Sequence, residues 1–398
     1  MNDQGDLSPR SVANVGAPGG KSVVAMLAGS AMSDMGLNIL PLILGSLTVI
    51  FGISQSVAGF VIFTELAAMG LTTLALSPAL HRLNRRTLAT FGAVLICVAN
   101  IASFAAPTPA LLFLTRALSG AGSGAIVSAT VAVASEHGKS HRVFVAMSGI
   151  SMFVSIGMFT LVPRLIAVQG PRSVFILMAL LAAIATILSL LLPKYSSEAR
   201  SAVTDTGASI RRFSLSDVPS VLLCGAFLLF FFSLNGAYFY VERIGNSIGM
   251  QLSAIGDGLA VAALVSLLGP VAASLVGLKF GRIGPIIAAV ALNAAGVIVC
   301  THTRSPDLFI AAISMSTVTL TFAPAYFMGL AASLVSSGRL TSASRGAATV
   351  GSTITPAVSA VILMYGGSYR TIGLVGGVSS LLAIVMLLAL RRYVRHSS

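Results

Sequence analysis

The chain has 398 residues, of which 56% are hydrophobic and only 9% are charged, and its formal net charge is +13. Soluble domains carry roughly 25% charged residues, so this composition excludes an ordinary soluble protein and indicates a membrane chain. The basic residues form short clusters between apolar runs, as charges beside a membrane do, and this distribution argues against nucleic acid as a partner.

Residues 1–22 are polar and rich in glycine and proline, without the charged-then-apolar pattern of a signal peptide, and we expect a disordered cytoplasmic tail there. The three cysteines lie in separate apolar runs, and His137 and His141 have no further ligand nearby. The sequence therefore predicts no disulfide, no metal site and no cofactor. It also lacks a phosphate-binding G-x-x-x-x-G-K-[ST] segment, which disfavours an ATP-driven pump.

Twelve apolar stretches follow, each long enough for a helix to cross the roughly 30 Å apolar core of a bilayer. We predict an all-α integral membrane protein with twelve transmembrane helices in two pseudo-symmetric six-helix bundles. The bundles are residues 23–192 and 218–390, joined by a polar cytoplasmic linker at 193–217 and followed by a tail at 391–398. The predicted spans are 23–47, 57–76, 88–106, 110–134, 143–166, 173–192, 218–241, 253–276, 284–301, 308–335, 343–365 and 371–390.

The distribution of lysine and arginine predicts the orientation of these spans. With the N-terminus in the cytoplasm, 18 of the 24 basic residues fall in cytoplasmic segments, five fall outside, and Arg116 alone lies within a span. Because positive charge accumulates on the cytoplasmic side, both termini are expected in the cytoplasm, with the protein in the inner (plasma) membrane.

Three charged residues lie well inside predicted spans: Asp34, Glu65 and Arg116. A guanidinium at that depth costs roughly 2.5–3.5 kcal/mol on insertion scales, so Arg116 is expected to face a watery cavity or a buried carboxylate. The depths of the three residues would let them meet in one cavity. In one interpretation, Asp34 or Glu65 carries the coupling proton, and Arg116 controls its protonation or holds an anionic solute. In the other, Arg116 forms a permanent ion pair with one of the carboxylates.

Polar side chains that interrupt apolar runs are further candidates for solute binding. Asn38 follows Asp34 on the same helix face, and Pro41 is expected to bend that helix. The alternatives are hydrogen bonds between helices and, for the tyrosines, a place in the membrane interface. The residues that we assign to the solute site are Arg116, Asn38, Asn235, Tyr238 and Tyr326.

Glu242, Arg243 and Asp257 bracket the outer loop between the seventh and eighth spans. This group is open to two interpretations, an outer gate or an ordinary ion pair at the membrane surface.

Two loops and one span resemble a known family. Residues 77–86 read SPALHRLNRR, which is similar to the loop pattern G-x-L-a-D-R-x-G-R-R of the major facilitator superfamily. A weaker copy, GLKFGRIG, occupies residues 277–284, and LTRALSGAGSGA at 114–125 resembles the R-x-x-x-G-x-G pattern of that family. The resemblance implies two six-helix bundles around a central cavity. It also implies a cytoplasmic gate in which the family's loop aspartate is replaced here, formed by His81, Arg82, Arg85 and Arg86.

The resemblance and the buried charges together predict a secondary active transporter and not an enzyme. Its expected cargo is a small organic solute or metabolite, with Arg116 favouring an anionic one, moved by proton symport through alternating access. The alternative is a proton-driven multidrug or metabolite efflux antiporter, although the fifth span lacks the glycine-rich pattern ending in Gly-Pro of many such antiporters. A non-transporting membrane enzyme or sensor is the competing class. The expected partners are the solute, protons and the lipid bilayer, and we expect a monomer.

Overall fold

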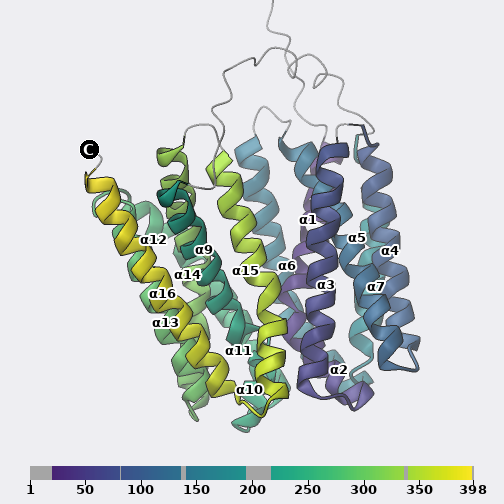
Figure 1. The fold of residues 1–398 in the computed structure, drawn as a ribbon. Coiled ribbons are helices and arrows are strands. Elements are labelled where there is room, and N and C mark those ends of the chain that lie inside the picture. Colours follow the sequence, from purple (N-terminus) through teal and green to yellow (C-terminus); the bar gives the residue numbers. More distant parts are fainter. Residues whose placement is uncertain (1–19, 81, 136–139, 194–216, 336–338, 397–398) are drawn as a thin grey trace, which may run out of the picture.

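The computed structural model describes residues 20–80, 82–135, 140–193, 217–335 and 339–396. These residues form long helices that run roughly side by side (Figure 1). Every regular element among them is helical, and strands are absent from this part of the chain. We call the side where the described chain begins at Gly20 and ends at His396 the terminal side, and the opposite side the far side.

The helices fall into two sets that follow the chain order. The first set comprises α1 (Gly20–Asn38), α2 (Leu40–Phe51), α3 (Gln55–Leu76), the short 3-10 helix η1 (Ser77–Ala79), α4 (Arg85–Ala105), α5 (Pro109–Ser135), α6 (Ser140–Gln169) and α7 (Ser173–Ser189). The second set comprises α9 (Val218–Tyr238), α10 (Val241–Ser247), α11 (Leu252–Ser266), α12 (Leu268–Val276), α13 (Ile283–His302), α14 (Pro306–Leu334), α15 (Arg339–Met364) and α16 (Tyr369–His396).

Each of the twelve predicted spans coincides with a helix or with two consecutive helices. Among the described residues, ten helical segments are long and apolar enough to cross a membrane, and the bent pair α1 and α2 makes an eleventh. The remaining span is α7, which is apolar but only 17 residues long. The chain is thus an all-helical membrane protein. At its C-terminal end α16 continues to His396, so most of the segment expected to be a tail is helical.

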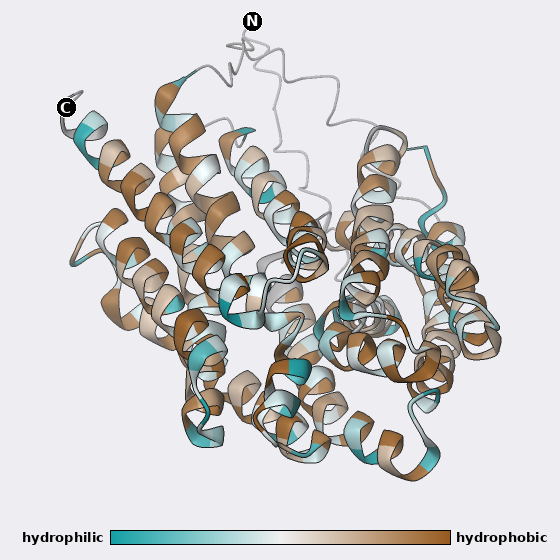
Figure 2. Cartoon of the chain, turned by 60° about the horizontal axis from the view of Figure 1, so that its bottom comes forward, coloured by the Kyte–Doolittle hydropathy of each residue, from teal (hydrophilic) through white to brown (hydrophobic). Residues whose placement is uncertain are grey.

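The outer surfaces of the helices are apolar, as a lipid environment requires. Leu74, Phe153 and Ile187 are about two-thirds or more exposed although they lie in the middle or last turns of helices. In Figure 2, apolar colouring covers most of the helices and hydrophilic colouring gathers at their ends and in the loops.

Local sequence signals explain where helices begin and break. Ser54 and Asn84 each accept a hydrogen bond from the backbone N–H three residues on, which caps α3 and α4. Gly52 ends α2 with a φ of 60°, a conformation that favours glycine. The first span breaks at Ile39, where α1 and α2 meet at 54°. Pro41 explains this break, because it has no N–H to bond to the carbonyl of the preceding turn.

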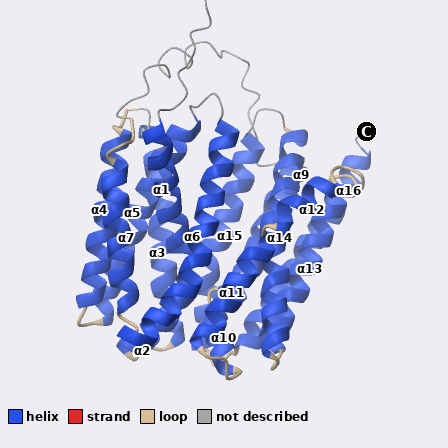
Figure 3. Ribbon diagram, turned by 180° about the vertical axis from the view of Figure 1, so that it is seen from behind, coloured by secondary structure: helices blue, strands red, loops and turns tan. Residues whose placement is uncertain are grey.

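The helices α1–α7 pack mainly on one another, and so do α9–α16; we call these the N-terminal bundle and the C-terminal bundle. The most extensive contacts between the two bundles are those of α3 with α15, α6 with α11, and α2 with α10. Figure 3 shows α6 and α11 side by side from behind, and Figure 1 shows α3 and α15 from the front. The residue limits assigned to the bundles and the linker stay a prediction.

The buried apolar residues form three clusters. The largest contains residues of both bundles, including Leu42, Phe159, Tyr240 and Ile255, and it crosses the interface toward the far side. The second lies wholly in the C-terminal bundle, around Phe227 on its terminal side. The third lies wholly in the N-terminal bundle. The bundles therefore share a core on the far side and keep separate cores on the terminal side.

Candidate functional site

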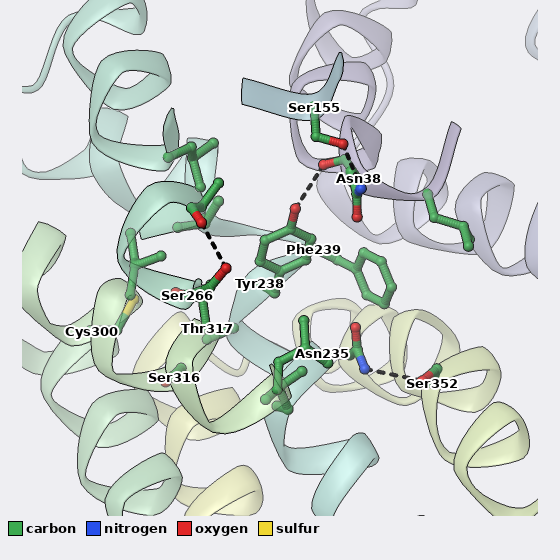
Figure 4. A pocket seen from close by; sticks show the side chains of 18 of the residues that line it. Asn38, Ser155, Asn235, Tyr238, Phe239, Ser266, Cys300, Ser316, Thr317 and Ser352 are labelled. Carbon is green, nitrogen blue, oxygen red and sulfur yellow. Dashed lines mark hydrogen bonds between the residues drawn. The ribbon is translucent and has the colours of Figure 1, made fainter. Parts of the chain in front are cut away.

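A cavity of about 240 Å³ lies between the two bundles. Its walls come from α1, α3 and α6 on one side and from α9, α10, α11, α13, α14 and α15 on the other (Figure 4). Ligand pockets in proteins commonly measure roughly 300–1,000 Å³, so this space suits a small solute. The lining is mainly apolar, with the rings of Phe159, Phe231 and Phe239, and none of its described residues is charged.

Three of the five residues that were assigned to the solute site line this cavity: Asn38, Asn235 and Tyr238. The Asn38 amide donates to Ser155 Oγ at 2.7 Å, and the Asn235 amide donates to the Phe231 carbonyl at 2.8 Å and to Ser352 Oγ at 3.1 Å. Tyr238 crosses the interface between the bundles, because its hydroxyl donates to the main-chain carbonyl of Asn38 at 2.7 Å. That carbonyl is available because the helix breaks there.

Arg116 and Tyr326 lie elsewhere. The Tyr326 hydroxyl donates to the carbonyls of Ala273 and Gly277 at the end of α12, at 3.1 and 3.0 Å. Arg116 is completely buried inside the N-terminal bundle. Neither residue lines the cavity, so the fixed positive charge that suggested an anionic solute is absent from its walls.

Arg116 lies in a buried polar cluster between α3, α4 and α5. Its Nη1 is 3.4 Å from Glu65 Oε1, and its Nη2 donates to Asn100 Oδ1 at 3.0 Å and to Ser103 Oγ at 2.8 Å. Ser119 Oγ donates to the same Glu65 oxygen at 2.7 Å. The other Glu65 oxygen, Oε2, has no hydrogen-bond partner among the described residues. The ion pair removes the cost of an isolated buried charge.

The small residues of α5 explain how Glu65 and Arg116 come so close. A Cβ at Gly120 would overlap the backbone carbonyl of Glu65 on α3, and a Cβ at Gly122 would lie 2.6 Å from the carbonyl of Gly92 on α4. Glycine at both positions therefore lets α5 approach two helices at near-backbone contact. This packing places Arg116 and Glu65 of facing helices within ion-pair distance.

A second, very small cavity lies beside Glu65. It measures about 10 Å³, room for about one water molecule, and α1, α2, α3 and α5 form its walls. Leu37 and Leu66 line both this space and the main cavity, so their side chains separate the two.

Asp34 does not join Glu65 and Arg116. Its carboxylate accepts a hydrogen bond from Ser30 Oγ at 3.3 Å, and Ser30 lies 3.1 Å from Ser151 Oγ of α6. No cation of the described residues forms an ion pair with it. Asp34 is partly exposed and lies one helical turn from Asn38 of the cavity, on the terminal side.

The predicted cytoplasmic gate is only partly described. His81 lies outside the described residues. Arg85 is buried at the start of α4, and Arg86 Nε donates to the Leu192 carbonyl at 2.6 Å, which ties α4 to the end of α7. Arg82 precedes them in an exposed turn. The hydrogen bond of Arg86 thus lies within the N-terminal bundle.

Several polar contacts close the far side between the bundles. Arg243 donates to the Gly45 carbonyl, and the Tyr369 hydroxyl donates to Gln55 Oε1. Beside them, Glu242 Oε2 lies 3.0 Å from Arg243 Nε. Burial raises the pKa of the Glu242 carboxyl, and the charge of Arg243 opposes part of that rise.

Asp257, the second acidic residue of that group, lies in α11 and pairs instead with Arg164 of α6, at 3.1 Å and about half exposed to solvent. It also joins the two bundles at the far side. Solvent screening makes such an exposed pair worth little in stability, of the order of 0–1 kcal/mol.

Sequence reasoning missed several residues of both sites. Asn100 and Ser103 bind Arg116, and Ser155 holds the Asn38 amide. Their only sequence signal is a polar side chain within an apolar run. Cys300, for which the sequence predicts neither a disulfide nor a metal site, is buried and also lines the cavity.

A helical membrane protein whose two halves enclose a solute-sized, uncharged cavity has the architecture of a solute transporter. Comparison with family models bears this out: the model described as Major Facilitator Superfamily matches residues 26–344. The chain belongs to that superfamily, whose members are transporters and not enzymes. Comparison with curated proteins gives no match.

Two solved structures share the fold. One is the nucleoside transporter NupG, in a single-residue variant, with a TM-score of 0.74 and 12% identity over 93% of this chain and 99% of that one. The other is a D-xylose-proton symporter, with a TM-score of 0.71 and 15% identity over 91% and 96%. At such low identity these likenesses establish the fold and leave the cargo of this chain open.

Proposed function

We propose that the chain is a proton-coupled secondary active transporter of a small, uncharged and mainly apolar organic solute. The observation that carries the proposal is the cavity between the bundles, whose walls combine aromatic rings with a few amide and hydroxyl groups and no charge. Such a composition is typical of sites for organic molecules. An anion placed there would lose its hydration without gaining a cationic partner, so an anionic cargo is disfavoured.

The arrangement of cores and contacts supports alternating access with the terminal side open. Tyr238, Arg243, Tyr369 and Arg164 make hydrogen bonds or ion pairs between the bundles, and these contacts lie at mid-depth or on the far side. The apolar clusters on the terminal side stay within single bundles. With the terminal side in the cytoplasm, as the distribution of basic residues predicts, this is an inward-facing form.

We propose Asp34 as the carrier of the coupling proton. It is a carboxylate without a cationic partner among the described residues, and it lies one turn from the cavity. Glu65 is held by Arg116 and Ser119 and is more deeply buried, which suits a structural ion pair that fixes α5 against α3. The Glu65–Arg116 pair is the alternative coupling site, because a water-sized space lies beside it.

A screen of uncharged organic solutes for thermal stabilisation of the purified protein identifies a binder, and flux of that binder is then measured in vesicles with an imposed pH gradient. Accumulation driven by the gradient, lost in Asp34→Asn but retained in Glu65→Gln, is the expected result. Loss in Glu65→Gln alone would move the coupling to the buried pair. Absence of any gradient-driven flux would refute proton-coupled transport.

The efflux alternative stays in contention because of the apolar lining. Rings and aliphatic side chains bind amphipathic foreign compounds with little regard to their detailed shape. The sign of the gradient-driven flux decides between them: movement of the solute with the protons indicates symport, and movement against them indicates antiport.

A further inference from the structure

The two asparagines of the cavity are held by bonds that determine which way each amide points. The Asn235 nitrogen donates to the Phe231 carbonyl, which can only accept. Its second acceptor, Ser352 Oγ, already donates its own proton to the Ala348 carbonyl at 3.1 Å. Both amide protons of Asn235 are therefore engaged, and its oxygen, Oδ1, faces the other way.

The same reasoning applies to Asn38. Its nitrogen lies 2.7 Å from Ser155 Oγ, and that hydroxyl donates to the Ser151 carbonyl at 2.8 Å, so it must accept from the amide. An inverted Asn235 amide would set its oxygen against the Phe231 carbonyl oxygen, and an inverted Asn38 amide would take the Ser155 proton away from the Ser151 carbonyl. No hydrogen bond from a described residue reaches the Oδ1 of Asn38 or of Asn235.

Figure 4 shows where these oxygens lie. The Asn38 oxygen points away from Ser155 and toward the Asn235 side of the pocket, and the Asn235 oxygen points away from Ser352 toward Tyr238 and Phe239. One comes from α1 of the N-terminal bundle and the other from α9 of the C-terminal bundle. The cavity thus offers two unoccupied acceptors from opposite walls.

Most donors of the lining are already used. The hydroxyls of Tyr238, Ser266 and Thr317 donate to the backbone carbonyls of Asn38, Ala263 and Ala262. Among the described hydroxyls of the lining, Ser316 alone makes no hydrogen bond. A buried acceptor without a donor costs free energy, so an occupant that supplies donors gains more than one that supplies further acceptors.

We propose that the Oδ1 atoms of Asn38 and Asn235 form a two-point acceptor site that selects solutes with an uncharged apolar body and a head bearing two N–H or O–H donors. A primary carboxamide is the simplest such head. This inference rests on the proposed transport function, because it names the class of solute that the same cavity takes.

The test compares three probes of one shape: 2-naphthamide, its N,N-dimethyl derivative and 2-naphthoate. Binding to the full chain in lipid nanodiscs is followed by naphthalene fluorescence, with empty nanodiscs to subtract partition into lipid. The chain contains no tryptophan, so little protein emission interferes. We expect 2-naphthamide to bind about tenfold more tightly than the dimethyl derivative, since two net hydrogen bonds are lost, and naphthoate to bind most weakly.

Two variants and one control locate the effect. Asn38→Leu and Asn235→Leu each weaken 2-naphthamide roughly fivefold and leave the dimethyl derivative unchanged. Asn293→Leu is the matched control, because Asn293 is a buried amide of the C-terminal bundle, like Asn235, but donates to Ser233 and does not line the cavity. The two test residues lie in different bundles, so if one variant misfolds, the other still tests the site. The comparison of the three probes on the wild-type protein requires neither variant.

Equal binding of 2-naphthamide and its dimethyl derivative, or no saturable binding of either, would overturn the acceptor site. Its failure is distinct from failure of the proposed function. Gradient-driven flux of another solute without donor preference would support the proposed transport function and refute the acceptor site. Donor-selective binding without flux would support the acceptor site and refute the transport function.

Discussion

The closed far side leads to a sharp prediction at Gly59 of α3. A Cβ added there would overlap the Tyr240 hydroxyl and would lie 3.0 Å from Ala360 Cβ and 3.2 Å from the Pro356 carbonyl. Tyr240 is fully buried, so its ring cannot swing aside, and the other two contacts belong to α15 of the opposite bundle. The clash exists only while the bundles are closed on the far side, and it vanishes when they separate.

Gly59→Ala therefore shifts the conformational equilibrium toward far-side opening. Overpacking of this kind costs roughly 1–3 kcal/mol. At about 1.4 kcal/mol per factor of ten, the open-to-closed ratio rises roughly 5- to 150-fold. The gain of alanine over glycine in helix propensity, about 1 kcal/mol, is the same in both forms and cancels.

Electron-electron distance measurements between spin labels at Val168→Cys and Tyr365→Cys report the opening. These residues are 84% and 82% exposed and lie at the far-side ends of α6 and α15. The labels are placed in a background without Cys97, Cys224 and Cys300. Gly59→Ala should add a longer-distance population that the parent protein lacks.

Gly70→Ala is the matched control, because Gly70 lies on the same helix and a Cβ there has no neighbour within 4 Å. It should leave the distances unchanged. Identical distributions for Gly59→Ala and the parent protein would refute the argument that close contact at Gly59 holds the far side shut.

Three further predictions concern charged groups. Arg116→Met leaves the Glu65 carboxylate buried without its cation and should lower the free energy of unfolding in detergent by roughly 3–5 kcal/mol. Adding Glu65→Gln should restore part of this loss, and equal free energies for the single and the double variant would contradict the pairing. Asp34→Asn should abolish flux driven by a pH gradient while solute exchange at equal pH persists, measured in vesicles. Burial raises the pKa of Glu242 while the far side is closed, so closure is favoured at low pH and weakens as the pH rises above the ordinary pKa of 4.5. The distances between the spin labels should follow this trend, and Glu242→Gln should remove it. A pH trend that survives in Glu242→Gln would exclude Glu242 as its source.

The spans were predictable because lipid imposes one requirement on every segment. A helix of about 20 apolar residues is needed whatever its neighbours are, so length and hydropathy are enough to place it. Pro41 likewise indicated the bend in the first span, since the missing N–H is a local property. Asn38, Asn235 and Tyr238 were identified for a similar reason: polar atoms inside apolar runs must face protein or water.

The partners of these groups were not predictable, because they depend on how each helix is rotated about its axis. In a membrane chain both the lipid-facing and the buried faces are apolar, so periodicity says little about rotation. From their depth in the membrane alone, Asp34, Glu65 and Arg116 could have met in one cavity. In the structure Asp34 faces α6 while Glu65 faces α5. Tyr326 shows the same limit, because its hydroxyl turns to α12 and away from the cavity.

The distribution of the apolar clusters has a thermodynamic consequence. In the alternating access that we propose, the bundles give up the cluster shared between them and bring together two that are now apart. If the areas are equal, the heat capacities of the two forms match, because burial of apolar surface dominates that quantity, and the logarithm of their population ratio varies linearly with inverse temperature. A strong curvature in the temperature dependence would instead reveal that one orientation leaves more apolar surface in contact with water.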